Sequence, residues 1–300
     1  MHRKYLLLAS ILLGVILVLS TYTLFIHKPL RPLDEENNIA GNTDESDNQQ
    51  LSNIGVDEGL STDNKSFIRE VPLHLDEKTE GNLKRFRSQA KQLHKEYPQS
   101  FFISMPTDEK KVALTFDDGP DNSSTKKILE ILNRNGVPAT FFYIGNQVNS
   151  YKETMQATIG GNHMVANHSW SHLRPTSLEM GDFQNELLSC EGALAPYIEG
   201  GKIYRPPYGL VTEDQVAMLE SEGYKVIVWS VDSMDWYFDD SNKIVECVTK
   251  TVHPGAIILM HSAGGSKNRQ ATVQALPDII DKLRQAGYEF VTLQDLLKNN

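Results

Sequence analysis

The sequence predicts an α/β fold in the form of a compact β/α barrel, complete or incomplete, with parallel strands. From residue 111 onward, short apolar runs alternate with amphipathic stretches. Such alternation is typical of parallel strands joined by crossover helices. About seven such units in roughly 190 residues suit one barrel, and an open, doubly wound sheet is the alternative.

The strands are predicted where apolar runs are short and rich in β-branched and aromatic residues. The predicted strands cover residues 112–116, 139–144, 164–166, 203–204, 225–231, 256–260 and 289–292.

Local signals predict where several helices begin and end. Ser123 or Ser124 can cap a helix that Gly136 ends. Pro277 suits the first turn of the last long helix, and Gly287 its end. Apolar residues recur at a spacing close to 3.6 in two of these helices, at Phe183, Leu187, Leu194 and Ile198 and at Ile279, Ile280 and Leu283.

The N-terminus, residues 1–26, predicts a transmembrane signal-anchor. Residues 5–26 are uncharged and would span about 33 Å as a helix, enough to cross a hydrocarbon core. No convincing small-residue cleavage site follows, so we favour an uncleaved anchor over secretion after signal cleavage. Basic residues flank both ends of the span, and we expect the large domain outside the cell membrane because the segment is N-terminal and signal-like.

Between the anchor and the domain, the composition predicts a tether. Residues 27–75 are acidic, polar and poor in aromatics, which predicts a flexible linker. Residues 76–107 include a charged, helix-compatible stretch with Leu83, Phe86 and Leu93 as candidate buried positions. We interpret this part as a lead-in helical segment, with a solvated extension of the linker as the alternative, and residues 108–300 as the main domain.

Charge and cysteine content exclude some classes of protein. The net charge is −10 and no Lys/Arg-rich stripe is present, which argues against binding to nucleic acid. The two cysteines, Cys190 and Cys247, are too few for a disulfide framework or a cysteine-ligated zinc site. We expect two buried free thiols, and a single disulfide is the alternative.

Polar residues follow most of the predicted strands at their carboxyl ends. In a parallel barrel these ends share one face, where active sites are assembled. The placements are Asp117 and Asp118 after the first strand, His168 after the third, Arg205 after the fourth, Asp232 and Asp235 after the fifth, and His261 after the sixth.

His168 and His172 are spaced i, i+4, so a helical turn after the strand would aim both imidazoles the same way. Two histidines and one carboxylate form a facial triad that leaves metal positions open, as a metallohydrolase needs. Such a pair alone is more typical of a solvated helix face. With a double aspartate and another strand-end histidine in the chain, we favour a metal site.

Five short motifs occur in a fixed order along the domain. Together they resemble the motifs of the polysaccharide deacetylase family, also called the NodB homology domain or carbohydrate esterase family four, over residues 108–298. The resemblance implies a distorted barrel of seven or eight β/α units and metal-dependent removal of acetyl groups from N-acetylated, or occasionally O-acetylated, glycans. The motifs are TFDDGP, NHSWSH, RPPYG, DSMDW and IILMH.

The resemblance implies a role for each motif residue around the metal. Asp118, His168 and His172 would hold the ion, and Asp117 would be the general base that takes a proton from the attacking water. Arg205 would orient this base, since a guanidinium suits a carboxylate.

By the same resemblance, the backbone N–H of Tyr208 would stabilise the oxyanion, and two preceding prolines would stiffen its loop. His261 would be the general acid, kept protonated by Asp235. For Asp232, a turn or capping role is at least as plausible as a catalytic one. The expected walls of the substrate groove are Trp236, for which a core position is the alternative, together with Pro206 and Pro207.

Departures from the family pattern are local. Asn162 and Ala166 stand where relatives commonly have glycine, and Ser262 follows His261 where many have aspartate. These differences concern loop geometry rather than the metal ligands. His163 is interpreted as a loop or core histidine and not as a ligand.

We therefore expect a metal-dependent N-deacetylase, monomeric in its catalytic domain, that acts on N-acetylglucosamine of peptidoglycan. A tether of about 50 residues reaches roughly 35 to 45 Å, which suits the wall layer just outside the membrane. The alternatives are an N-acetylmuramic acid deacetylase, a chitooligosaccharide deacetylase, an O-acetyl esterase of the same family and a non-catalytic glycan-binding scaffold. Zinc is the expected metal, with cobalt, nickel or manganese possible at the same ligands.

Overall fold

The computed structural model describes residues 68–198, 201–265 and 269–298. The chain divides into two units, Met1–Leu60 and Ser61–Asn300, and all described residues belong to the second. The predicted anchor and residues 27–67 of the predicted linker lie outside the described residues. Within the described ranges, every helix is too short or too polar to cross a membrane.

The strands form one sheet in which every pairing is parallel. Its order is β1-β6-β5-β4-β3-β2-β8-β7, and β9 pairs with β2 beside this path. The strands are β1 (Phe101–Phe102), β2 (Lys111–Asp117), β3 (Thr140–Tyr143), β4 (Met164–Asn167), β5 (Ile203–Tyr204), β6 (Lys225–Ile227), β7 (Val231–Asp232), β8 (Ala256–His261) and β9 (Glu289–Phe290).

The run predicted as one strand, residues 225–231, is two strands that change partners. β6 pairs with β5 near one end of the sheet, whereas β7 pairs with β8 at the other end. Between them, the N–H of Val228 donates to the carbonyl of Phe102 (2.9 Å) and that of Ser230 to Ile257 (3.1 Å). One stretch of chain thus joins both ends of the sheet, which curls into the distorted β/α barrel that the sequence predicts.

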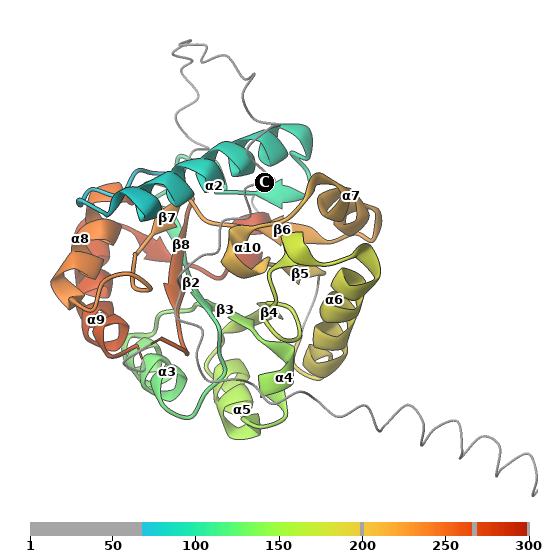
Figure 1. Cartoon of the computed structure of the whole chain (residues 1–300). Coiled ribbons are helices and arrows are strands. Elements are labelled where there is room, and N and C mark those ends of the chain that lie inside the picture. Colours follow the sequence, from blue (N-terminus) through green and yellow to red (C-terminus); the bar gives the residue numbers. More distant parts are fainter. Residues whose placement is uncertain (1–67, 199–200, 266–268, 299–300) are drawn as a thin grey trace, which may run out of the picture. The chain divides into compact units, whose positions relative to one another are not determined.

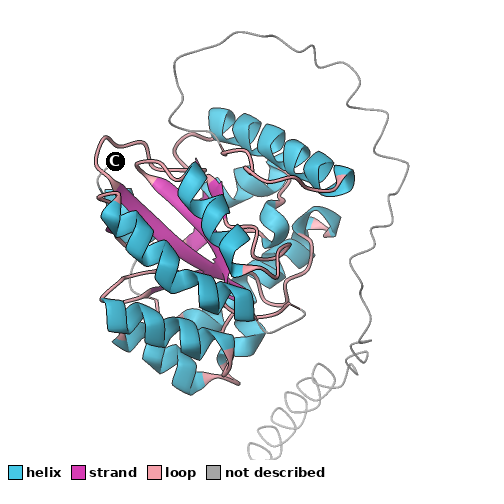
Figure 2. Cartoon of the chain, turned by 90° about the vertical axis from the view of Figure 1, so that its left-hand side faces the viewer, coloured by secondary structure: helices cyan, strands magenta, loops and turns pink. Residues whose placement is uncertain are grey.

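Helices surround the strands (Figures 1 and 2). Residues 225–232 run from β6 to β7 without a helix, and in Figure 1 α2 takes the position between α7 and α8 in the outer ring. The helices are α2 (Glu77–Glu96), α3 (Ser124–Asn135), α4 (Gly145–Val148), α5 (Lys152–Gly160), α6 (Met180–Leu194), α7 (Glu213–Ser221), α8 (Ser241–Thr251), α9 (Gln270–Gln285) and α10 (Leu293–Lys298).

The helix ends agree in part with the sequence signals. Ser123 is the N-cap residue of α3 and Gly136, with φ 59°, ends it. Pro277, however, lies inside α9, which begins at Gln270, so the expectation of a first-turn proline is wrong. The neighbouring Leu276 is fully buried. Burial of such apolar residues offsets the backbone hydrogen bond that an interior proline removes.

The lead-in helix is present as α2, and its three candidate apolar positions, Leu83, Phe86 and Leu93, are buried. Residues 68–75, which the sequence places in the linker, also lie against the domain. Leu75 is buried in the core, and the N–H of Arg69 donates to the carbonyl of Ser230 (2.8 Å). Apolar residues at the C-terminal end of the predicted linker therefore pack against the domain.

Both cysteines are buried free thiols, as expected. Cys190 lies on α6 and its thiol contacts the carbonyl of Tyr143 at 3.5 Å. Cys247 lies on α8 and belongs, like Cys190, to the larger apolar cluster of the core. Burial raises the pKa of each thiol to about 12, so neither is a thiolate at neutral pH.

Candidate active site

The strand register brings the predicted polar residues to one face. Asp117 is the last residue of β2 and lies opposite His261, the last residue of β8. Two strands further along the sheet, the N–H of Arg205 donates to the carbonyl of Asn167 at the end of β4 (3.0 Å). His168 follows Asn167 directly. Asp117 and His261, and likewise His168 and Arg205, therefore lie at the carboxyl ends of the strands.

Asp118, His168 and His172 form a cluster whose candidate ligand atoms all lie within 4.8 Å of one another. The Oδ1 atom of Asp118 lies 3.2 Å from Nε2 of His172 and 3.6 Å from Nε2 of His168. Nδ1 of His168 is 2.8 Å from the carbonyl of Arg205. A carbonyl only accepts, so Nδ1 carries the proton and Nε2 presents a lone pair.

The cluster fits a divalent cation. In the described part of the chain, the buried Oδ1 of Asp118 accepts no hydrogen bond, which is costly unless another group satisfies it. One anionic oxygen and two imidazole nitrogens are ligands that zinc and similar metals prefer.

The loop that carries His172 is not the helical turn that the spacing predicts. Ser169 and His172 have φ values of 66° and 59°, and the loop is held by side chains instead. The amide N–H of Ser169 donates to the side chain of Asn167 (2.9 Å), and that of His172 to the hydroxyl of Ser169 (3.0 Å). Glu186 on α6 accepts from the N–H and hydroxyl of Ser171 (2.8 and 2.7 Å).

Asp117 is buried beside the cluster and is held by Arg205, which is fully buried. Nη1 of Arg205 donates to Oδ1 of Asp117 (2.7 Å) and to the hydroxyl of Thr115 (2.8 Å). Its other nitrogens donate to the carbonyls of residues 227 and 228. Oδ2 of Asp117 lies 3.7 Å from Nε2 of His168, beyond hydrogen-bond distance. This oxygen can therefore accept a proton.

His261 and Asp235 form a hydrogen-bonded pair on the other side of the site. Nδ1 of His261 is 2.7 Å from Oδ1 of Asp235, while Oδ2 accepts from the N–H of His261 (2.9 Å) and the hydroxyl of Thr272 (2.8 Å). Burial alone would lower the pKa of His261, but the Asp235 carboxylate outweighs burial and raises it. His261 therefore favours the protonated form, which suits a proton donor.

Tyr208 and Trp236 are exposed aromatic side chains; Tyr208 lies beside His172, and Trp236 directly follows Asp235 in the sequence. Tyr208 has φ 61° and is 52% exposed, and its ring packs on the edge of His172 with a centroid distance of 4.9 Å. Trp236 is 40% exposed, so the alternative of a core position is wrong. Pro206 and Pro207 are buried, which corrects the expectation that they wall the groove. Their fixed φ angles instead restrict the loop before Tyr208.

Asp232 and His163 have contacts that give them structural roles. Asp232 accepts from the N–H of Met234 (2.8 Å) and from the indole N–H of Trp236 (3.1 Å), which is a turn role. Burial raises the pKa of Asp232 to about 6. His163 packs edge-on against Phe141 at 5.5 Å, and burial lowers its pKa to about 4. It is a neutral core histidine, as the sequence indicates.

Arg269 is a residue of this site that the sequence does not reveal. Its Nε donates to the carbonyl of Ala263 (2.8 Å) and its Nη1 to the carbonyl of Asp235 (3.2 Å). Its Nη2 lies 3.5 Å from Oδ2 of Asp118. Arg269 thus links Asp118 of the cluster to Asp235 and to the segment after His261. It is 151 residues from Asp118 in sequence, and no local motif marks it.

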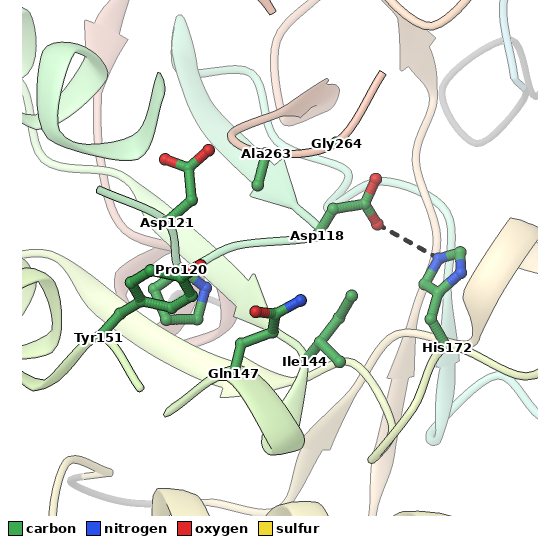
Figure 3. Close-up of a pocket in the computed structure, with 9 residues that line it drawn as sticks. All are labelled: Asp118, Pro120, Asp121, Ile144, Gln147, Tyr151, His172, Ala263 and Gly264. Atoms are coloured by element: carbon green, nitrogen blue, oxygen red, sulfur yellow. Dashed lines mark ion pairs between the residues drawn. The ribbon is translucent and has the colours of Figure 1, made fainter. Parts of the chain in front are cut away.

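A pocket of about 360 Å³ opens beside the cluster (Figure 3). Asp118 and His172 lie on one side of it, and polar side chains of the β2–α3 loop and of the α4–α5 region lie across from them. These side chains can form hydrogen bonds with a hydroxyl-rich ligand, and sequence motifs did not identify them. The other lining residues are Pro120, Asp121, Ile144, Gln147, Tyr151, Ala263 and Gly264.

Backbone strain is concentrated around the site. Outside glycine, a positive φ is uncommon and costs free energy unless the surroundings impose it. Among the described residues with such angles, Asn162 alone lies away from the site loops. The others are Asp118, Ser169, His172, Tyr208, Met234 and Arg269.

Comparisons with known proteins agree with this architecture. A family model described as polysaccharide deacetylase matches residues 104–227. A peptidoglycan-N-acetylglucosamine deacetylase of Bacillus cereus is 33% identical over 204 residues, which cover 67% of this chain and 73% of that protein. A peptidoglycan-N-acetylmuramic acid deacetylase of Bacillus subtilis is 32% identical over 207 residues, which cover 66% of this chain and 42% of that protein.

A solved structure gives the same result for the fold. The crystal structure of the Bc1960 peptidoglycan N-acetylglucosamine deacetylase superposes with a TM-score of 0.62 at 33% identity. The match covers 65% of this chain and 91% of that one. Given the matched family model, these relatives and the shared barrel, the chain is a member of the polysaccharide deacetylase family.

Proposed function

We propose that this protein is a metal-dependent N-deacetylase that hydrolyses N-acetyl groups of peptidoglycan at N-acetylglucosamine. The observation that carries the proposal is the cluster of Asp118, His168 and His172 beside two further groups. One is Asp117, held by Arg205, and the other is the His261–Asp235 pair. A base, a cation site and an acid at the carboxyl ends of neighbouring strands are the groups that amide hydrolysis requires.

Asp118, His168 and His172 would hold a divalent cation, which when bound supplies Lewis-acid activation of water and of the acetyl carbonyl. Asp117 accepts the proton of the attacking water at Oδ2, because Arg205 occupies Oδ1. The Arg205 contact fixes the direction of this carboxylate. Its full burial keeps bulk water away from the ion pair.

The remaining residues act on the oxyanion and the leaving group. The exposed Tyr208, at the edge of His172, would direct its backbone N–H toward the oxyanion that develops on the acetyl carbonyl. His261, protonated through Asp235, donates its proton from Nε2 to the leaving amine. Water adds to the carbonyl carbon, the carbon–nitrogen bond breaks, and acetate and a free amine are released.

The substrate proposal rests on the relatives and on the sequence. The relatives described above act, by name, on N-acetylglucosamine and N-acetylmuramic acid of peptidoglycan. We favour N-acetylglucosamine, with N-acetylmuramic acid as the second candidate. Zinc is the proposed metal, because imidazole and carboxylate ligands suit it. The uncharged segment of residues 5–26 supports a membrane-anchored protein with its catalytic domain outside the cell.

The proposal is tested by incubating the full chain, purified in a mild detergent, with peptidoglycan and zinc. Acetate release and the mass of each sugar after digestion are measured. The expected result is a mass loss of about 42 Da, the difference between an acetamide and an amine, on N-acetylglucosamine alone. Loss on N-acetylmuramic acid would select the second candidate. No acetate from a zinc-loaded protein would favour the glycan-binding scaffold.

A further inference from the structure

Helix α2 fills a gap in the barrel. β6 and β7 follow each other without a helix, so the outer ring would be open there, and α2 occupies that position in Figure 1. It lies before residues 104–227, which the family model matches. Its residues Phe86, Ala90 and Leu93 share an apolar cluster with the β6 segment and with Val211. This helix is therefore part of the domain's core.

Phe86 of α2 lies against the backbone of the loop that carries Tyr208. Its ring stacks on Trp229 with a centroid distance of 4.6 Å and an interplanar angle of 28°. At Gly209, directly after Tyr208, an added Cβ would lie 2.6 Å from the Phe86 ring and 2.8 Å from the Trp229 ring. The two rings thus leave no space between themselves and this backbone.

Gln89, one turn further along α2, holds the end of the same loop. Its Nε2 donates to the carbonyl of Val211 at 3.0 Å. Within the loop, the N–H of Gly209 donates to the carbonyl of Pro206 (2.9 Å) and that of Leu210 to Pro207 (3.2 Å). Trp229, on which Phe86 stacks, also lies 5.8 Å from the Arg205 guanidinium.

We propose that α2 clamps the loop of residues 206–211, and that Phe86 and Gln89 are positioning residues for the backbone N–H of Tyr208. The proposal rests on the oxyanion role proposed for Tyr208. Neither residue touches the substrate. They act by holding the strained backbone of Tyr208, with φ 61°, in the orientation that catalysis requires.

The test compares the full chain with three variants, Phe86→Ala, Gln89→Ala and Leu83→Ala. Leu83 is the matched control, because it is buried on the same helix but belongs to the other apolar cluster. Hydrogen–deuterium exchange of the loop amides is measured with zinc bound, together with kcat and KM for acetate release. All measurements are made below the Tm of every variant, so that each is folded.

The clamp predicts that Phe86→Ala and Gln89→Ala exchange the amides of Gly209 and Leu210 about tenfold faster or more, with unchanged zinc affinity. It predicts a kcat lowered by about tenfold with little change in KM, because removing an oxyanion donor outright costs roughly 10² to 10³ in kcat. Leu83→Ala should leave loop exchange and kcat as in the wild type.

The clamp would be overturned if the loop amides of folded Phe86→Ala protein exchanged at the wild-type rate. It would also be overturned if Leu83→Ala accelerated this exchange as much as Phe86→Ala does. The exchange measurement needs no turnover. If the wild-type protein released no acetate, the proposed function would fail while the exchange rates still decided whether α2 holds the loop.

Discussion

Replacing Asp235 by Asn should shift the pH dependence of catalysis through His261. The carboxylate accepts from Nδ1 of His261 at 2.7 Å and also from its backbone N–H. Asn keeps the shape and one acceptor but removes the charge that raises the pKa of His261. Burial, which lowers that pKa, then acts without opposition.

The magnitude follows from the strength of this one contact. An opposite charge at this distance favours the charged form of a titratable group by roughly 1.4–4 kcal/mol. The neutral imidazole keeps its Nδ1–H and the hydrogen bond to Asp235, so this charge attraction is what separates the two forms. At a pH above the pKa of His261, its loss should reduce the protonated fraction, and therefore kcat, by roughly 10- to 1,000-fold. The pKa of His261 is raised in the folded protein, so activity is present below this pKa and is lost as the pH rises through it.

The assay is acetate release from N-acetylglucosamine oligomers between pH 5 and 10. In Asp235→Asn the decline on the alkaline side should begin at a lower pH than in the wild type. Thr272→Val is the matched control, since it removes one hydrogen bond to Asp235 and leaves the charge. An alkaline decline at the wild-type pH in Asp235→Asn would refute the assignment of His261 as the acid.

Three further predictions concern other residues of the site. Asp118→Asn should lower bound zinc well below one ion per chain by elemental analysis, and full occupancy would remove Asp118 from the ligand set. Arg205→Lys keeps the charge beside Asp117 but leaves buried acceptors without a hydrogen bond, so the free energy of unfolding should fall by about 2–4 kcal/mol. The Tm measured by calorimetry should then fall by roughly 5–15 °C, and an unchanged Tm would be inconsistent with the observed contacts. Asp232→Asn should keep kcat within about threefold, because its oxygen still accepts from Trp236; a hundredfold loss would make Asp232 catalytic rather than structural.

The sequence predicted most of the fold because its strand and helix signals are local. The apolar runs predicted the positions of the strands, and Gly136 ends α3, where its φ of 59° favours a residue without a side chain. Active sites form at the carboxyl ends of parallel strands, and this rule predicted that Asp117 and His261 lie close together. The register confirms this pairing.

The rest depends on contacts between residues distant in sequence. The division of residues 225–231 into β6 and β7 follows from a change of hydrogen-bond partners, which no local pattern records. The loop before His172 depends on Glu186 of another helix. Arg269 reaches Asp118 only after the barrel has formed. These are tertiary interactions that override local propensity.

The central claim is that Asp117 takes the proton while Asp118 holds the cation. It is tested most directly by removing zinc from the full chain, adding it back, and comparing wild type with Asp117→Asn. The account predicts that both proteins bind one zinc ion with similar affinity. It predicts acetate release only from the zinc-loaded wild type. Release at the wild-type rate from Asp117→Asn, or from metal-free protein, would contradict it.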